Sequence, residues 1–189
     1  MKVLVLIADG SEEIEVLTPV DYLRRANLDV TLCSVSPSRT VTCSHGVSVN
    51  TDMTLDSFLS AGGALPDAIV VPGGMPGTTN IAASDATLKL IGEMYKDKKL
   101  VCAICAAPAL VLSKCNLLAG HKWTCYPGMQ SQAGKESEAG YQEGISFVHD
   151  GTLITGRGPG AAEEFSMEIV KTLCGNESYE KIKKGSCQR

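Results

Sequence analysis

Short apolar runs alternate with longer amphipathic segments along the chain. Four runs rich in β-branched and other apolar residues, each typical of a buried strand, lie at 2–8, 29–35, 67–74 and 100–104. A shorter strand is predicted at 121–127. Helices are predicted at 11–27, 80–99, 107–115, 161–175 and 178–185. This alternation predicts an α/β protein whose mainly parallel sheet is covered by helices on both faces.

Local signals add detail to this pattern. The helix at 11–27 is expected to begin at Ser11, whose hydroxyl is a common N-cap, and to kink or restart at Pro19. Two hairpins are expected, one at 41–52 and one at 145–157 around Asp150–Gly151. No linker, repeat or low-complexity tract interrupts the chain, so residues 1–189 are interpreted as one domain.

Composition narrows the classes of function. The chain has 189 residues and a formal net charge of -4 without a basic stripe, so a nucleic-acid partner is not expected. No apolar run reaches the roughly 18 residues of a membrane span. The first apolar run continues into acidic residues without a cleavage-like site, which favours a strand over a signal peptide. Eight cysteines in a chain with ample core indicate reduced thiols and a cytoplasmic location.

The turns that follow the predicted strands hold the candidate chemistry, because parallel strands end at one edge of a sheet. Cys105 directly follows the strand at 100–104, has alanines close on both sides, and precedes Pro108 at an expected helix start. Small neighbours at a strand-to-helix turn are what a nucleophile elbow requires. The helix dipole would favour a thiolate there, and the Ala106 N–H would stabilise an oxyanion.

Cys102 and Cys105 are spaced C-x-x-C, which allows other interpretations. Three residues of a strand span roughly 10 Å, beyond the Cα separation of about 7 Å that a disulfide allows. The two side chains are also expected to point to opposite faces of the sheet. A redox pair is therefore less favoured than an elbow, and a zinc site lacks further ligands at suitable spacing. A buried structural cysteine at a helix start is the remaining alternative.

A nucleophilic cysteine needs a proton partner. Glu12, Glu13 and Glu15 follow the first strand, and acids in the first turn of a helix usually only stabilise its dipole. Glu15 differs because apolar residues flank it, so its carboxyl is expected to be desolvated and protonated near neutral pH. The histidines are weaker candidates, because they lie in polar turns or in a hairpin: His45, His121 and His149.

Four segments, in this order and spacing, resemble the ThiJ/PfpI superfamily over nearly the whole chain. They are ADGSEEIEVLTPVDYLRRA (8–26), VVPGGMPG (70–77), AICAAPALVL (103–112) and ITGRGPGAAEEF (154–165). The closest similarity is to the branch of the Parkinson-disease-associated protein deglycase. The resemblance implies a flavodoxin-like three-layer α/β/α sandwich with a small β-hairpin excursion, and usually a homodimer.

The resemblance also implies roles for particular residues. Cys105 corresponds to the nucleophile, and a protonated Glu15 would hydrogen-bond its thiolate or the sulfinate formed on oxidation. The N–H groups of Gly74 and Ala106 would bind an anion. The other residues expected around the substrate are Gly73, Tyr126 and Pro159. No cofactor or metal is expected.

Relatives in this superfamily are described as glutathione-independent glyoxalases, as deglycases, and as oxidation sensors or chaperones. The leading hypothesis is therefore a cofactor-independent glyoxalase or deglycase acting on methylglyoxal, glyoxal and their amine adducts. The alternative is a redox-sensing protein or chaperone that is regulated by oxidation of Cys105 to sulfinate and has little turnover.

The sequence departs from its relatives at several positions. Tyr126 stands where many relatives place a histidine near the cysteine, which leaves Glu15 as the main acid–base candidate. Ala106 stands where the protease-like branch carries a histidine, which argues against peptidase activity. The segment 157–165 lacks the His-Glu pair of glutamine amidotransferases. His45 replaces the arginine of a Cys-Ser-Arg segment, so an arginine-dependent contact at a dimer interface is not carried over.

Overall fold

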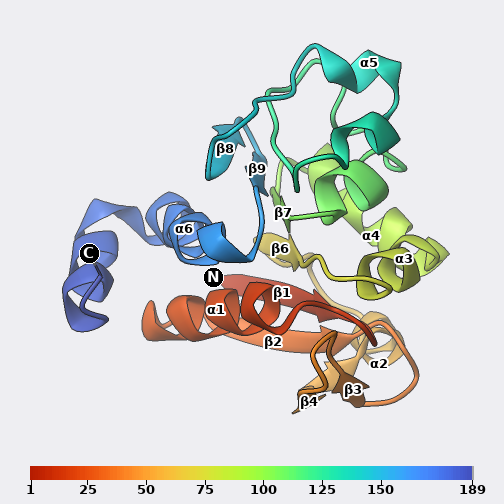
Figure 1. The fold of residues 1–189 in the computed structure, drawn as a ribbon. Helices are drawn as coiled ribbons and strands as arrows, with labels where there is room; N and C mark the ends of the chain where they lie inside the picture. The colour runs from red at the N-terminus through yellow and green to blue at the C-terminus, as the bar shows by residue number, and fades with distance from the viewer. Residues whose placement is uncertain (189) are drawn as a thin grey trace.

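The central feature of the fold is a seven-stranded sheet in the order β5-β2-β1-β6-β7-β9-β8, seen in a computed structural model that describes residues 1–188 (Figure 1). Its strands are β1 (Lys2–Ile7), β2 (Asp29–Ser34), β5 (Met53–Thr54), β6 (Ala68–Val71), β7 (Leu100–Ile104), β8 (Phe147–Asp150) and β9 (Leu153–Gly156). Neighbouring strands are parallel except β8 and β9. The inner order β2-β1-β6-β7-β9 is that of flavodoxin-like sheets, so the predicted fold class is confirmed.

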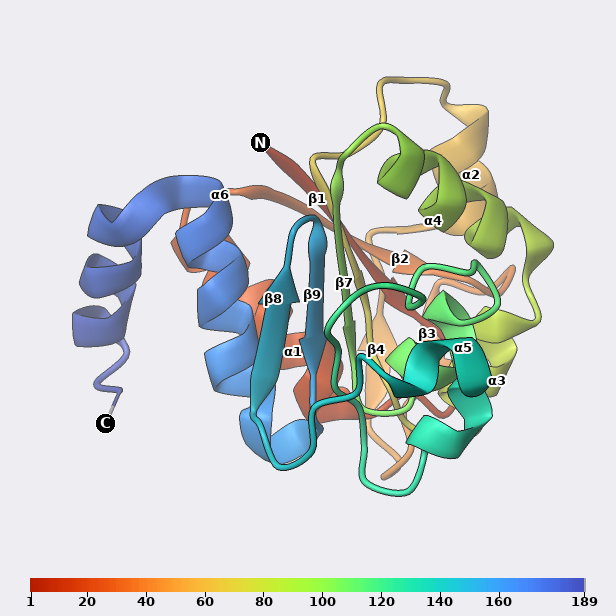
Figure 2. The same cartoon turned by 90° about the horizontal axis from the view of Figure 1, so that it is seen from above.

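Helices cover both faces of this sheet, and Figures 1 and 2 show the two layers. The helices are α1 (Glu13–Arg25), α2 (Leu55–Ser60), α3 (Gly77–Ala82), α4 (Asp85–Lys96), α5 (Lys135–Glu138) and α6 (Ala162–Gly185). Apolar residues of α1 and α6 pack on one face, and those of α3 and α4 pack on the other. Along β7, Leu100, Cys102 and Ile104 face the first layer, whereas Val101 and Ala103 face the second. Burial on both faces explains why the strands are continuously apolar in sequence.

Both predicted hairpins are present. β8 and β9 pair antiparallel at one edge of the central sheet. β3 (Thr40–Thr42) and β4 (Ser48–Asn50) form a separate two-stranded antiparallel sheet. Backbone hydrogen bonds of 2.8 Å from Gly10 N–H to Thr42 O and of 2.9 Å from Ser44 N–H to Ser11 O attach this small sheet to the turn after β1. The β3–β4 excursion therefore lies near the carboxyl ends of the parallel strands, where the candidate site was predicted.

The predicted boundaries of the first helices need correction. The N-cap of α1 is Glu12, whose side chain accepts a hydrogen bond from Glu15 N–H. The Ser11 hydroxyl instead accepts one from Ala8 N–H at 3.0 Å, so Ser11 closes the preceding turn. α1 also continues through Pro19 without interruption. The helix predicted at 80–99 divides into α3 and α4, because Ser84 caps a new helix start.

Three later elements also differ from prediction in detail. The helix predicted at 107–115 is a π-helical turn at Pro108–Leu112, closed by a 3.2 Å hydrogen bond from Ser113 N–H to Pro108 O. The strand predicted at 121–127 is reduced to a single bridge between Trp123 and Tyr141. The two helices predicted at the end of the chain are joined in α6, which has a non-helical break at Gly175. Among the described residues, no helix has both the length and the apolar character that a bilayer crossing requires.

Candidate active site

Cys105 occupies a strained turn directly after β7. Its φ of 65° lies in the left-handed region, which residues with a side chain rarely adopt and which nucleophile elbows use. Its N–H donates to Gly156 O at 2.9 Å, and its carbonyl accepts from Tyr126 N–H at 2.8 Å. The turn is therefore fixed by hydrogen bonds to two neighbouring segments, and Cys105 as a whole residue is only 8% exposed.

Cys102 has a different environment from Cys105. It is fully buried within β7, and burial alone raises its thiol pKa well above the usual value. The expectation that the two side chains point to opposite faces is wrong, because both contribute to the core layer under α1 and α6. The positive φ of Cys105 turns its side chain away from the alternation of the strand. All eight cysteines are free thiols in the structure.

Glu15 lies beside this thiol in the first turn of α1. Its side chain is buried, and its Oε2 accepts a 2.8 Å hydrogen bond from Gly73 N–H. Burial raises the pKa of Glu15 to about 7, although interactions with Cys105 and with Gly73 N–H lower it. The carboxyl contacts Cys105 without a hydrogen bond of regular geometry, and among the described residues Oε1 has no partner. A protonated Glu15 near neutral pH, as expected from the sequence, agrees with this environment.

Gly73 lies between the Cys105 thiol and the Glu15 carboxyl. A Cβ atom placed on it would lie 2.5 Å from Cys105 Cβ and 2.6 Å from Glu15 Oε2. Only glycine therefore lets the turn after β6 pass close enough for its N–H to reach the carboxylate. The same turn is joined to the start of α1 by a 3.0 Å hydrogen bond from Glu12 N–H to Gly73 O.

Gly74 and Ala106 provide the two backbone N–H groups directed at the Cys105 sulfur. Gly74 has a φ of 87°, and a Cβ there would collide with the backbone of Glu12. Two donors converging on a sulfur are also placed to hold the oxygen of a group bound to it. The structure thus brings together the five residues of this centre, which come from three turns at one sheet edge: Glu15, Gly73, Gly74, Cys105 and Ala106.

The ionisation of the Cys105 thiol differs from the expectation. Burial and the Glu15 carboxylate raise the pKa of Cys105 to about 12, whereas the N–H groups of Gly74 and Ala106 lower it. The predicted lowering of the thiol pKa is wrong, because burial and the Glu15 carboxylate outweigh the groups that lower it. When Glu15 holds the proton, its charge is removed and its O–H becomes a donor. The thiolate therefore depends on a proton that the two groups share.

Tyr126 and Pro159, also predicted near the substrate, line a cavity of about 490 Å³. Tyr126 follows the Trp123 bridge and is 49% exposed, and Pro159 follows β9. Both flank the turn at Cys105, since Tyr126 N–H bonds to Cys105 O and Cys105 N–H bonds to Gly156 O. Their side of the turn therefore forms one wall of a cavity whose lining does not include the Cys105 thiol.

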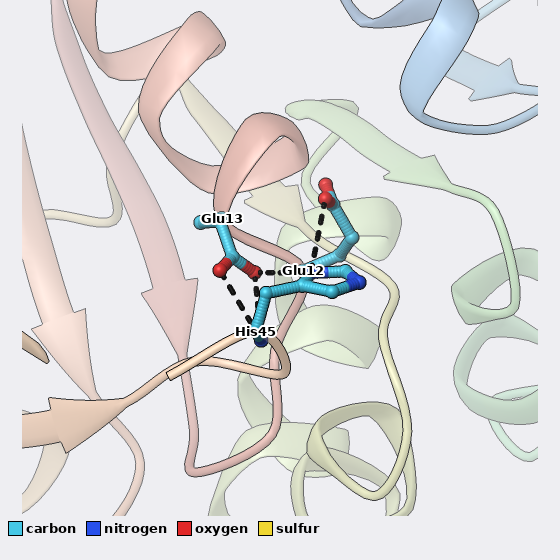
Figure 3. A group of neighbouring side chains, drawn as sticks. All are labelled: Glu12, Glu13 and His45. Carbon is cyan, nitrogen blue, oxygen red and sulfur yellow. Dashed lines mark hydrogen bonds and ion pairs between the residues drawn. The ribbon is translucent and has the colours of Figure 1, made fainter. Parts of the chain in front are cut away.

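Figure 3 shows a second cluster, in which the His45 ring lies between the carboxylates of Glu12 and Glu13. His45 Nδ1 is 3.0 Å from Glu13 Oε2 and 3.9 Å from Glu12 Oε1. A hydrogen bond to Glu13 raises the pKa of His45. The ligand atoms lie within 4.8 Å of one another, a spacing compatible with a cation. However, Glu12 already caps α1, and Glu13 also accepts from Ser44 Oγ and His45 N–H, so the cluster is satisfied as an ion pair.

The pairing of Glu13 with His45 was not predicted from the sequence, which placed them in a helix start and a hairpin 32 positions apart. The other histidines do not reach the site. His121 bonds to Tyr95 and Asp150, and His149 bonds to Glu168. These contacts lie near the starts of the parallel strands, at the opposite edge of the sheet.

Comparison with known proteins places this arrangement in a family. The model of the DJ-1/PfpI family matches residues 1–172. The chain belongs to the DJ-1/PfpI family. Protein dj-1beta of Drosophila melanogaster is 36% identical over 182 residues, covering 96% of this chain and 94% of the relative. The protein named glutathione-independent glyoxalase DJR-1.2 of Caenorhabditis elegans is 31% identical over 185 residues, covering 97% and 94%.

A solved DJ-1/PfpI structure shares the fold closely. The structure titled "Toxoplasma gondii DJ-1, oxidized" is similar with a TM-score of 0.90 and 34% identity, and the match covers 98% of this chain and 97% of that one. The family resemblance inferred from the sequence is therefore confirmed. The match to the DJ-1/PfpI model ends at residue 172, shortly before the break in α6 at Gly175.

Proposed function

We propose that the protein is a cofactor-independent glyoxalase that also acts as a deglycase on glyoxal adducts of amines, and so protects against carbonyl and oxidative stress. One observation carries the proposal. The Cys105 sulfur lies between two N–H donors and a buried carboxyl, and Oε1 of that carboxyl has no partner among the described residues. The name of the Caenorhabditis elegans relative supports the reaction class.

The first step is addition of the thiol to methylglyoxal. The thiol proton passes to Glu15, and the thiolate forms a bond to the aldehyde carbon. The electron pair of the C=O bond moves to oxygen, giving an alkoxide that the N–H groups of Gly74 and Ala106 stabilise. Transfer of the proton from Glu15 to this oxygen gives a hemithioacetal and leaves Glu15 as a carboxylate.

The second step moves a proton between two carbons. The Glu15 carboxylate removes the proton from the former aldehyde carbon, the electron pair forms a C=C bond, and the π pair of the ketone moves to its oxygen, which gives an enediolate. Glu15 returns the proton to the neighbouring carbon while the hydroxyl proton passes from the first oxygen to the second, and the product is a lactoyl thioester. Water then hydrolyses the thioester, which releases lactate and restores the thiol. A carboxyl with a pKa of about 7 is suited to accepting and returning a proton near neutral pH.

Deglycation uses the same first bond. The thiolate attacks the carbon of a hemiaminal, the C–N bond breaks, and the leaving amine takes the proton. The resulting hemithioacetal then follows the path above.

The decisive test is a steady-state assay of methylglyoxal conversion to lactate by the purified protein, without added thiol. We expect Cys105→Ala to abolish lactate formation, whereas Cys115→Ala, which removes a partly buried thiol beside α4, retains it. Glu15→Gln should lower the rate by about 10²-fold or more, and more than Tyr126→Phe does. Wild-type turnover by Cys105→Ala would refute the proposal.

Oxidation sensing is a second candidate function. The two N–H donors and the protonated Glu15 that would hold an alkoxide are also suited to the oxygens of a Cys105 sulfinate. The similar Toxoplasma gondii structure carries the word "oxidized" in its title. We expect mass spectrometry after mild peroxide to show a gain of two oxygens on the Cys105 peptide. Oxidation spread over all eight cysteines would contradict selective sensing.

Assembly as a homodimer is also proposed. Ile14 and Leu17 are large apolar residues that α1 exposes, and Val47 of the β3–β4 excursion is exposed as well. Burial of this surface against a second copy would remove apolar area from water. Sedimentation velocity should give a dimer for the wild type and a smaller species for Ile14→Glu. Identical sedimentation of the two proteins as monomers would exclude the dimer.

A further inference from the structure

A cavity lies between two segments that are hydrogen-bonded to the backbone of Cys105. Its walls are the turn at Tyr126–Pro127 and the segment 157–161 after β9. Both walls are hydrogen-bonded to the backbone of Cys105, one through Tyr126 N–H and the other through Gly156 O. The cavity therefore adjoins the backbone of the turn at Cys105, although its lining includes neither Cys105 nor Glu15.

The volume of the cavity is larger than the proposed smallest substrates need. It measures about 490 Å³, within the range of roughly 300–1,000 Å³ typical of sites for larger ligands. Methylglyoxal has five non-hydrogen atoms, comparable to a few water molecules, each of which occupies about 30 Å³ in the liquid. A substrate that fills the cavity carries a further group beyond its two carbonyls.

The charges around the cavity indicate what that group is. Arg157 is the cationic side chain in the lining, and no Asp or Glu contributes to it. The Arg157 side chain is exposed and makes no ion pair with any residue in 1–188, while its backbone N–H donates to Ser146 O at 2.9 Å. The hydroxyl-bearing residues Ser146 and Tyr126 line the same space. An unpaired guanidinium in a cavity without acids, on a chain of net charge -4, favours an anion.

The position of Arg157 also suits a short substrate. β7 and β9 are parallel with Ile104 paired to Gly156, so Cys105 and Arg157 directly follow the ends of two neighbouring strands. Neighbouring strands lie about 4.8 Å apart. An anionic group a few atoms beyond the reacting carbonyl is therefore at the right scale to bind the guanidinium.

We propose that Arg157 makes this cavity an anion subsite, so that the preferred substrates are 2-oxoaldehydes, or their amine adducts, that carry a carboxylate or a phosphate. The inference rests on the proposed function, since it assigns a substrate class to the same reaction. Arg157 binds the anionic group and takes no part in the proton transfers. The guanidinium can form two parallel hydrogen bonds to either anion, a geometry that lysine cannot reproduce.

The test compares substrates that differ in the anionic group. Initial rates are measured with 4,5-dioxopentanoate (carboxylate), 3-phosphooxy-2-oxopropanal (phosphate) and neutral 2-oxopentanal. We expect the wild type to show a kcat/KM for at least one anionic substrate about tenfold or more above that for 2-oxopentanal. The ratio should fall about tenfold in Arg157→Gln and in part in Arg157→Lys. It should remain in Arg25→Gln, which removes the same charge from the distant end of α1.

Each outcome decides the inference. Preference for only one of the two anionic substrates supports the subsite and identifies its anion. The subsite is overturned if the wild type shows a ratio of kcat/KM values near one, or if Arg157→Gln shows the same ratio as the wild type. In either case, turnover of 2-oxopentanal still supports the proposed function. If no oxoaldehyde is turned over, the proposed function fails. The anion subsite is then tested by calorimetric titration with 4-oxopentanoate, which does not react. Binding to the wild type that is lost in Arg157→Gln supports the subsite. Absence of binding to the wild type overturns the subsite.

Discussion

Replacing Glu15 by Gln is expected to remove a pH dependence from the stability of the fold. Burial raises the pKa of Glu15 from 4.5 to about 7 in the folded protein. The folded state therefore holds this proton more tightly than the unfolded state. Its contribution to stability is complete below the unfolded pKa and is lost as pH rises through the folded value. The difference between the two pKa values corresponds to about 3 kcal/mol of unfolding free energy.

The measurement is urea denaturation at several pH values between about 4.5 and 7.5. Cys105→Ala serves as the parent protein, so that the thiol does not share the proton. Relative to the double variant Cys105→Ala/Glu15→Gln, the parent should lose about 3 kcal/mol over this range, at up to about 1.4 kcal/mol for each pH unit. The amide itself changes stability by a constant amount, so the slope and not the offset is diagnostic.

A matched control is Glu93→Gln in the same parent, because Glu93 is exposed on α4. We expect this variant to follow the parent at every pH. If the Glu15 double variant also runs parallel to the parent, the buried carboxyl does not hold a proton near neutral pH. The proton transfers assigned to Glu15 would then lose their physical basis.

Two further predictions concern the surroundings of the site. Gly73→Ala would place a Cβ 2.5 Å from Cys105 Cβ, so we expect a loss of about 1–3 kcal/mol in denaturant unfolding and a fall of about 10²-fold in lactate formation. Gly92→Ala, in a helix with no atom within 4 Å of the new Cβ, should instead gain about 0.5–1 kcal/mol; similar behaviour of the two variants would contradict the close approach at Gly73. The hydrogen bond from Glu13 raises the pKa of His45, so an NMR titration should show a pKa above the usual histidine value that falls in Glu13→Gln, and an identical curve in that variant would rule out the pair.

The fold was predictable because its strands are apolar throughout and each is followed by a helix-length segment. Two predicted boundaries were wrong where side chains make the hydrogen bonds that a regular strand or the expected helix cap would have made. Thr124 N–H donates to the Thr155 hydroxyl at 2.9 Å, and Thr124 Oγ1 donates to Gln142 O, so the segment at 121–127 does not extend a strand ladder. The cap of α1 moved from Ser11 to Glu12 for the same reason.

Some features of the candidate site could likewise be predicted from the sequence, and others could not. Cys105 and Glu15 were identifiable because each stands out in its local sequence, one by its small neighbours and the other by its apolar neighbours. The raised pKa of the Cys105 thiol could not be predicted from the sequence, because it depends on burial and on the charge of Glu15, which reaches the thiol from α1. The ion pair of His45 with Glu13 likewise joins segments whose proximity no local pattern encodes.

The backbone at Cys105 has a consequence for how the sequence responds to redesign. A residue with a side chain at a φ of 65° carries a conformational cost of roughly 1–2 kcal/mol that glycine avoids. A search for more stable variants guided by backbone geometry alone would therefore favour glycine at this position and delete the thiol on which the proposed function depends. Thermal stabilisation of this protein should leave the turn after β7 unchanged, because the backbone conformation favours glycine whereas the proposed chemistry requires cysteine.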